Sequence, residues 1–407
     1  MKKALATILA LVMAIGLCSI SWAAGSALPA AENGVIKLTE NVTLTERWEV
    51  AANTEITLDL NGYSITSAGQ VIMNNGKLTI TDNKGGGKIV STGSQAIGVG
   101  SNSVTNIQKA IVESVEGAVI TGRATGATIN IYDGTFSASD NAVIAGNGSD
   151  REGTENTINI SGGVFTGKIT TGGYVACGIY APWKDKINVT GGTFNITGGA
   201  GIVARAGNVT VTNAVFNTTG NATGKVGDSR VVVPCSAIVF DSQANYPAMN
   251  NDSVIHVVSG KFNSEVDAVS MIKNDNETDR VAVTGGTFSS DVSAYAAGDT
   301  PVASNNGTYY VGEETIQNAA NNLSAGQQLK IEKGAVTING AEYRAGGNAT
   351  YTKPSSGGYY YYQPTTDTKT DGTKGSPKTF DAGIALYVGM ALTSAAGVAF
   401  VGKKRED

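Results

Sequence analysis

The eleven residues KINVTGGTFNI, from Lys186 to Ile196, have close copies on both sides, TINISGGVFTG before them and RVAVTGGTFSS after them. Six of the nine phenylalanines in the chain occupy the same slot of this repeat. Aligned copies end at Phe136, Phe165, Phe194, Phe216, Phe262 and Phe288, and two degenerate copies end at Ile89 and Ile111. The spacings are 22, 25, 29, 29, 22, 46 and 26 residues. Self-similarity of this period is typical of a solenoid, whose turns bury their apolar faces against one another.

Each copy predicts three short strands. Apolar and polar residues alternate at Ile187–Val189, as in a half-buried strand, and Gly191 and Gly192 then turn a corner before the inward-pointing Phe194. A third apolar piece recurs between copies, as GIYA at 178 and GIVA at 201. Three short strands per turn describe a parallel β-helix in which like residues stack about 4.8 Å apart. The gap of 46 residues fits either one turn with an insertion or two turns.

These residues resemble the pectate-lyase-like right-handed parallel β-helix of bacterial surface proteins over about residues 35–310. Ile56–Ile65, ITLDLNGYSI, resembles the first turns of such coils, and Ser289–Gly312 resembles their exit segment. The predicted fold is therefore all-β, with a single coil of about ten turns over residues 25–312. A small C-terminal cap over 313–345 is expected to hold a helix near Glu314–Asn322 and a hairpin.

Both ends of the chain have patterns that are typical of targeting segments. Lys2 and Lys3 precede an apolar stretch that ends in small residues, which predicts a signal peptide over 1–24; a lipid anchor on Cys18 is disfavoured by the bulky Leu17. Residues 383–401 are uncharged and are followed by Lys403, Lys404 and Arg405, which predicts a transmembrane helix with a cytoplasmic basic tail. Residues 346–375 are rich in Gly, Ser, Thr and Tyr and predict a disordered stalk.

The segment before the apolar span resembles the sorting signals that sortase-type transpeptidases read in Gram-positive bacteria. The matching residues are Ser376, Pro377, Lys378, Thr379 and Phe380, within a sorting signal at 376–407. The resemblance implies cleavage after Thr379 and a covalent link to peptidoglycan at the cell surface. Ser376 and Phe380 depart from the Leu-Pro-x-Thr-Gly form, so an uncleaved membrane anchor remains the alternative.

Catalytic chemistry has little support in the sequence. The only histidine, His256, takes an outward-facing slot of the repeat. Acidic residues are dispersed, at Asp133, Asp140, Asp150, Asp185, Asp228, Asp241, Asp252 and Asp267. Asp275, Glu277 and Asp279 favour a solvated loop over a calcium site. We therefore expect no catalytic residue, metal or cofactor, with a pectate-lyase-like polysaccharide lyase or a glycoside hydrolase as the alternative function.

The remaining candidates concern binding. Tyr174, Tyr180 and Trp183 lie in a lengthened turn, where exposed rings could stack on sugars or, alternatively, pack the insertion onto the coil. Cys177 and Cys235 are expected to be two buried thiols rather than a disulfide. The net charge of -5, with no basic patch, excludes nucleic acid as a partner. The sequence thus predicts a non-catalytic, surface-anchored adhesin or structural component, with host or plant glycans as candidate ligands.

Overall fold

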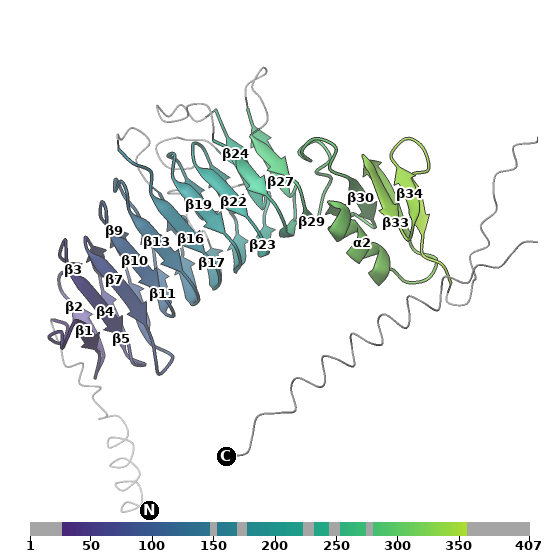
Figure 1. Ribbon diagram of the computed structural model, residues 1–407. Helices are drawn as coiled ribbons and strands as arrows, with labels where there is room; N and C mark the ends of the chain where they lie inside the picture. The colour runs from purple at the N-terminus through teal and green to yellow at the C-terminus, as the bar shows by residue number, and fades with distance from the viewer. Residues whose placement is uncertain are drawn as a thin grey trace, which may run out of the picture. The chain divides into compact units, whose positions relative to one another are not determined.

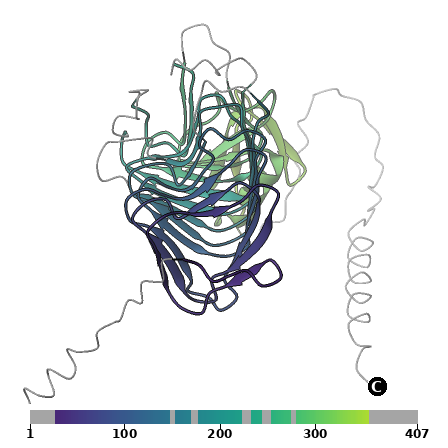
Figure 2. The ribbon, with the colours of Figure 1, turned by 90° about the vertical axis from the view of Figure 1, so that its left-hand side faces the viewer.

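The structure, a computed structural model, describes residues 27–146, 153–168, 177–222, 232–243, 253–273 and 280–355. Within them the chain forms a parallel β-solenoid with three strands per turn, as predicted (Figure 1). Seen after a quarter turn, the strands surround the interior of the coil (Figure 2), which buried hydrophobic side chains fill. The predicted signal peptide, sorting signal and transmembrane helix lie outside the described residues.

Three parallel sheets form the walls of the coil. Sheet A has ten strands: β1 Val35–Lys37, β4 Glu55–Asp59, β7 Lys77–Thr81, β10 Val104–Ile107, β13 Thr128–Ile131, β16 Thr157–Ile160, β19 Lys186–Val189, β22 Asn208–Val211, β25 Ile255–Val257 and β28 Val281–Val283. Sheet C has nine: β3 Trp48–Val50, β6 Ile72–Asn74, β9 Gln95–Val99, β12 Gly117–Ile120, β15 Ile144–Ala145, β18 Cys177–Ala181, β21 Ala200–Ala204, β24 Ile238–Asp241 and β27 Val269–Ile272. The coil therefore completes about nine turns.

Sheet B carries the phenylalanines and continues into the cap. Its parallel strands are β2 Val42–Leu44, β5 Ser64–Ser67, β8 Lys88–Ser91, β11 Ile111–Ser114, β14 Thr135–Ala138, β17 Val164–Lys168, β20 Thr193–Thr197, β23 Ala214–Thr219, β26 Gly260–Ser264 and β29 Gly286–Phe288. Antiparallel strands then follow in the order β31 Thr308–Val311, β30 Val302–Asn305, β32 Gln328–Lys333 and β35 Thr350–Thr352.

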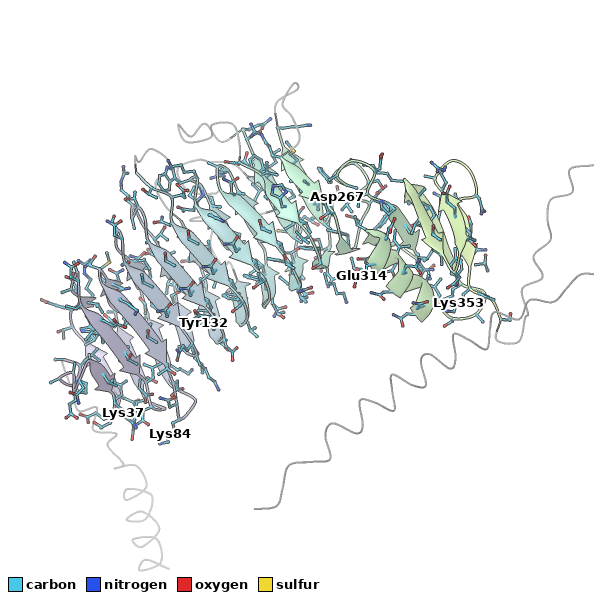
Figure 3. The ribbon with its side chains drawn as sticks, in the orientation of Figure 1. Lys37, Lys84, Tyr132, Asp267, Glu314 and Lys353 are labelled. Atoms are coloured by element: carbon cyan, nitrogen blue, oxygen red, sulfur yellow. The ribbon has the colours of Figure 1, made fainter. Side chains whose placement is uncertain are left out.

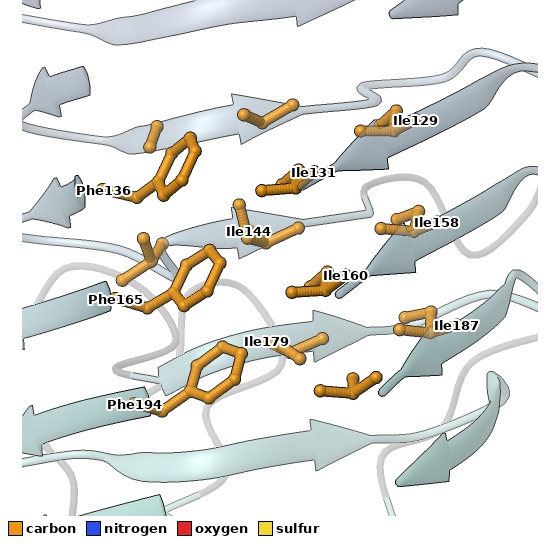
Figure 4. Packing of buried hydrophobic residues seen from close by; sticks show 14 of the residues in the cluster. Ile129, Ile131, Phe136, Ile144, Ile158, Ile160, Phe165, Ile179, Ile187 and Phe194 are labelled. Atoms are coloured by element: carbon orange, nitrogen blue, oxygen red, sulfur yellow. The ribbon is translucent and has the colours of Figure 1, made fainter. Parts of the chain in front are cut away.

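The six phenylalanines form one continuous stack inside the coil, and Figure 4 shows three of them, Phe136, Phe165 and Phe194. Successive ring centroids lie 4.9, 4.3, 4.5, 5.7 and 4.8 Å apart, with interplanar angles of 8° to 11°. Columns of isoleucine from sheets A and C fill the space beside the rings. Each ring is at most 1% exposed, so its burial contributes roughly 1.5–3 kcal/mol.

The glycine pair before each phenylalanine has two separate physical roles. A Cβ atom at Gly191 would collide with the carbonyl oxygen of Ser161, one turn below, so the first glycine permits close approach of two backbones. Gly192 has a φ of 96°, a conformation that a side chain strongly disfavours. The corner is therefore tight only because both positions lack a side chain.

Asparagine side chains form a ladder on the outer face of sheet A. They occupy the polar position between the two buried residues of each strand, as Asn188 does between Ile187 and Val189. Asn188 Nδ2 donates to Asn159 Oδ1 at 2.8 Å, Asn159 to Asn130 at 2.8 Å, and Asn130 to Asn106 at 2.9 Å. Each amide is thus satisfied by its neighbours one turn away, which explains why asparagine recurs there. His256 continues the same column and is exposed, as predicted.

The 46-residue gap is one long turn. Strand β26 pairs directly with β23, placing Phe262 opposite Phe216, and Asn263 Nδ2 donates to Asn217 Oδ1 across the same 46 residues. The two-turn interpretation is therefore wrong. An insertion between strands leaves the register of the stack unchanged.

The cap differs from the prediction at both of its boundaries. It contains the expected helix, α2 Glu313–Asn322, and the hairpin β33 Ala335–Ile338 with β34 Ala341–Arg344. It begins earlier than residue 313, because β31 pairs antiparallel with β29 and β30 pairs with β32. It also extends past 345, since β35 pairs with β32 and Tyr351 is 2% exposed in the cap core. No helix in the described part of the chain has the length and apolarity to cross a membrane.

Candidate functional site

The outer face of sheet C differs from that of the other two sheets. Strands β12, β18, β21 and β24 are buried on both faces, whereas strands of sheet A, such as β16, alternate between buried and half-buried residues. A second apolar cluster lies outside the coil: Ile120, Ala142, Ala145, Cys177, Tyr180, Ala200, Val203, Val233 and Val239. The sequence signal for it is the unbroken apolar run of these strands, typical of a strand covered on both sides.

The aromatic side chains predicted to bind sugars are not exposed. Tyr180 is 8% exposed and Trp183 is 1% exposed, so neither ring presents a face to a ligand. Tyr180 belongs to the outer cluster of sheet C, which corresponds to the packing alternative. The prediction of sugar stacking is therefore wrong for these two residues, and Tyr174 lies outside the described residues.

A buried charged group lies on the same face. Arg205 Nε donates to Asp241 Oδ2 at 2.9 Å, and Arg205 Nη1 donates to the Tyr180 hydroxyl at 2.7 Å. Both charged side chains are fully buried. Their mutual attraction offsets the cost of removing two charges from water. The group therefore ties neighbouring turns together, and its burial keeps it from contact with a substrate.

The other candidate acids have structural partners or stand apart. Asp185 accepts hydrogen bonds from the backbone and side chain of Asn156, and Asp133 accepts one from the Gly134 amide in a turn, as predicted. Charged side chains are spread along the chain, as the labels in Figure 3 show for Lys37, Lys84, Asp267, Glu314 and Lys353. Among the described residues no three His, Cys, Asp or Glu side chains come together as a metal-binding group.

An open groove of about 400 Å³ lies over β6, β9 and β12, and we call it the sheet C groove. It begins where the outer apolar cluster ends, at Ile120. Gly98 sits between Met73 and Ile120 in register, and the hollow left by its missing side chain is taken by the amide of Gln70. The polar side chains that line the groove are Arg47, Gln70, Asn75, Gln95, Ser101, Thr121 and Arg123. None of these residues belongs to a motif that is visible in the sequence.

Gln70 forms part of the floor of the groove. Its amide fills the hollow so closely that a Cβ atom at Gly98 would collide with Gln70 Nε2. Arg47 Nη1 donates to Gln70 Oε1 at 3.3 Å, and Arg47 Nη2 pairs with Glu49 at 2.6 Å. These contacts hold the amide in one orientation, with its oxygen toward Arg47.

Two polar atoms of the groove residues lack a protein partner. Gln70 Nε2 and Thr121 Oγ1 are buried and have no hydrogen-bond partner among the described residues. A buried donor or acceptor left unpaired costs about 1–3 kcal/mol. Both atoms are enclosed by protein, so a ligand would instead contact the exposed side chains of the lining, such as Arg47, Ser101 and Arg123, which make the groove the strongest candidate for a binding site in the described part of the chain.

Both cysteines of the described chain are buried free thiols, as predicted. Burial raises the pKa of the Cys235 thiol to about 11, and it also raises the pKa of Cys177. A thiol stays protonated below its pKa, and the thiolate is the nucleophile. At about pH 8 we therefore expect Ellman's reagent to modify Cys177 and Cys235 only after denaturation. Rapid modification of the folded protein would contradict their burial.

Comparison with known proteins gives no match: no protein-family model, curated protein or solved structure is significantly similar to this chain. The structure itself establishes a parallel β-solenoid with three strands per turn and a mixed cap.

Proposed function

We propose that this protein is an exported, surface-anchored β-solenoid that binds glycans without catalysis. The sheet C groove is the observation that carries the proposal. Among the described residues that line it, the polar groups are amides, hydroxyls and guanidiniums, which donate and accept hydrogen bonds. Sugar hydroxyls pair with such groups, and the half-buried Met73 offers apolar surface to the ring carbons. No carboxylate or imidazole is among the described residues of its lining, where it could transfer a proton in general acid–base catalysis.

The scaffold suits a binding role because it is preorganised. Met73, Gly98 and Ile120 come from three successive strands whose positions are fixed by parallel pairing. A site built on paired strands loses little conformational entropy when a ligand binds. The solenoid therefore presents its polar groups at fixed spacing, as a displayed binding surface requires.

Substitution of Gln70 tests the binding proposal. Gln70→Glu keeps the size of the side chain but replaces the buried donor Nε2 with an oxygen. We expect it to weaken glycan binding about tenfold, because it places a charge in a floor that faces uncharged sugar hydroxyls. The measurement is binding of the full mature chain to a panel of plant, mucin and wall glycans, followed by calorimetry on the glycan retained.

Gln108→Ala provides the matched control, because Gln108 is an exposed glutamine outside the groove. Unchanged binding of Gln70→Glu would contradict the role of the groove. Product release must be scored in the same assay. Release of unsaturated or reducing sugars would replace the binding proposal with the polysaccharide lyase or hydrolase alternative.

The anchor is a separate part of the proposal. Its support is the resemblance of Ser376–Phe380 to sortase signals and the apolar span with its basic tail, all outside the described residues. We propose that a sortase-type transpeptidase cleaves after Thr379 and joins it to peptidoglycan. Thr379→Ala should then move the protein from detergent-resistant wall material to the membrane fraction. Unchanged wall association would exclude attachment at Thr379.

A further inference from the structure

We infer that a second binding site, for one or two uncharged sugar rings, lies between the last turns of the coil and α2. An open cleft of about 470 Å³, here called the junction cleft, occupies this position. Its main side chains are Thr287 of β29, Tyr310 of β31, Thr315, Asn318 and Asn322 of α2, and Gln327 after the helix. It shares no residue with the sheet C groove.

Helix α2 has one face buried in the cap core and one polar face along the cleft. Ile316 and Ala320 are fully buried in the cap core and hold the helix in place. Thr315, Asn318 and Asn322 are spaced three and four residues apart, so they form one polar stripe along the cleft. The helix thus presents a row of hydrogen-bonding side chains from a fixed position.

Hydrogen bonding within the protein does not explain the two asparagines of this stripe. Asn318 is an interior residue of α2, where asparagine is a poorer helix former than alanine by up to about 0.7 kcal/mol, and Asn322 is the last residue of the helix. Neither Asn318 nor Asn322 makes a side-chain hydrogen bond to any described residue. Gln317 of the same helix, by contrast, donates its amide to the Thr337 carbonyl. The free amides are therefore available to a ligand.

Two further amides of the cleft are used to fix its walls. Asn305 Nδ2 donates to the Gln328 carbonyl at 2.7 Å, and Gln327 Oε1 accepts the Ser324 amide at 2.8 Å. Tyr310 pairs with Thr287 across antiparallel strands and is half-buried against the cap core. An aromatic ring held in this way can stack on the C–H face of a sugar.

The chemistry of the cleft selects its ligand class. No charged side chain is among the described residues that line it, so a charged ligand would find no counter-ion there. A purely apolar ligand would leave the amides facing it unpaired, which costs free energy. Vicinal hydroxyls match amides that both donate and accept. The volume falls within the range of small-ligand sites, about 300–1,000 Å³.

The test uses isotope-labelled full mature chain, titrated with maltose, lactose and N,N′-diacetylchitobiose. At least one of these probes should shift the NMR signals of the Asn318 and Asn322 side-chain amides. Asn318→Ala combined with Asn322→Ala should weaken that binding about tenfold, because two hydrogen bonds are lost while helix propensity rises. The matched control is Asn321→Ala, on the same helix but outside the cleft.

The outcomes separate this site from the sheet C groove. Gln70→Glu should leave binding at the junction cleft unchanged, whether or not the groove binds glycans. The inference is overturned if no probe shifts these amides, or if Asn321→Ala weakens binding as much as the double variant. A clear preference for a uronic-acid disaccharide, or for a peptide, would also overturn it.

Discussion

Replacing Phe194 with alanine is expected to lower the free energy of unfolding by about 3–5 kcal/mol, the range for truncating a fully buried aromatic residue. Its ring lies between those of Phe165 and Phe216, with centroids 4.3 and 4.5 Å away, and is fully buried. Gly178 packs directly against the ring, so on that side there is no side chain to fill the cavity. In a solenoid each turn contacts only its neighbours, so one gap weakens two interfaces at once.

Urea unfolding monitored by circular dichroism measures this loss. Tyr132→Ala is the control, because Tyr132 is 52% exposed and its truncation should change stability by no more than about 0.5 kcal/mol. Phe194→Leu should cost less than alanine, since it retains part of the buried volume. A loss below about 1 kcal/mol for Phe194→Ala would contradict the stack as the main stabilising element of the coil.

We expect the second large loss of unfolding free energy when the buried ion pair of Arg205 and Asp241 is broken. Arg205→Met removes the guanidinium that pairs with the buried Asp241 carboxylate, and such a change costs about 3–5 kcal/mol. Replacing both residues, as Arg205→Met with Asp241→Leu, removes both buried charges. The double variant should therefore be more stable than the sum of the two single losses implies.

A double-mutant cycle in urea measures the coupling between the two residues. Lys88 and Glu113 form a pair of similar geometry, 2.9 Å apart, but their side chains are 42% and 41% exposed. Lys88→Met should cost no more than about 1 kcal/mol, because water screens this pair. Simple additivity of the Arg205 and Asp241 losses would show that the buried pair does not act as a unit.

The coil could be predicted from the sequence because its determinants are local and repeated. The Gly-Gly corner, the alternation at Ile187–Val189 and the phenylalanine slot each recur, so one turn predicts the next. The sheet C groove could not be predicted in this way. The groove depends on Gln70, whose amide lies against Gly98 of the next turn. It also depends on Arg47, which orients that amide and has no counterpart in the repeat.

The error over Tyr180 and Trp183 has the same origin. Aromatic residues in a lengthened turn suggest exposure when only the inner core of a coil is considered. The outer face of sheet C is apolar, however, and Tyr180 packs within it and accepts a hydrogen bond from Arg205, 25 residues away. A side chain's burial on that face is decided by residues of other turns, which no single repeat contains.

The long turn between Phe216 and Phe262 shows how this molecule can change. The segment between them is about twice as long as a usual turn, yet the two rings still stack nearly parallel, at 8°. Their centroids lie 5.7 Å apart, the widest spacing of the stack, so the insertion loosens the contact but keeps the register. Insertions at such turns could therefore change the exposed residues of the solenoid repeatedly during evolution, while its buried core stays the same.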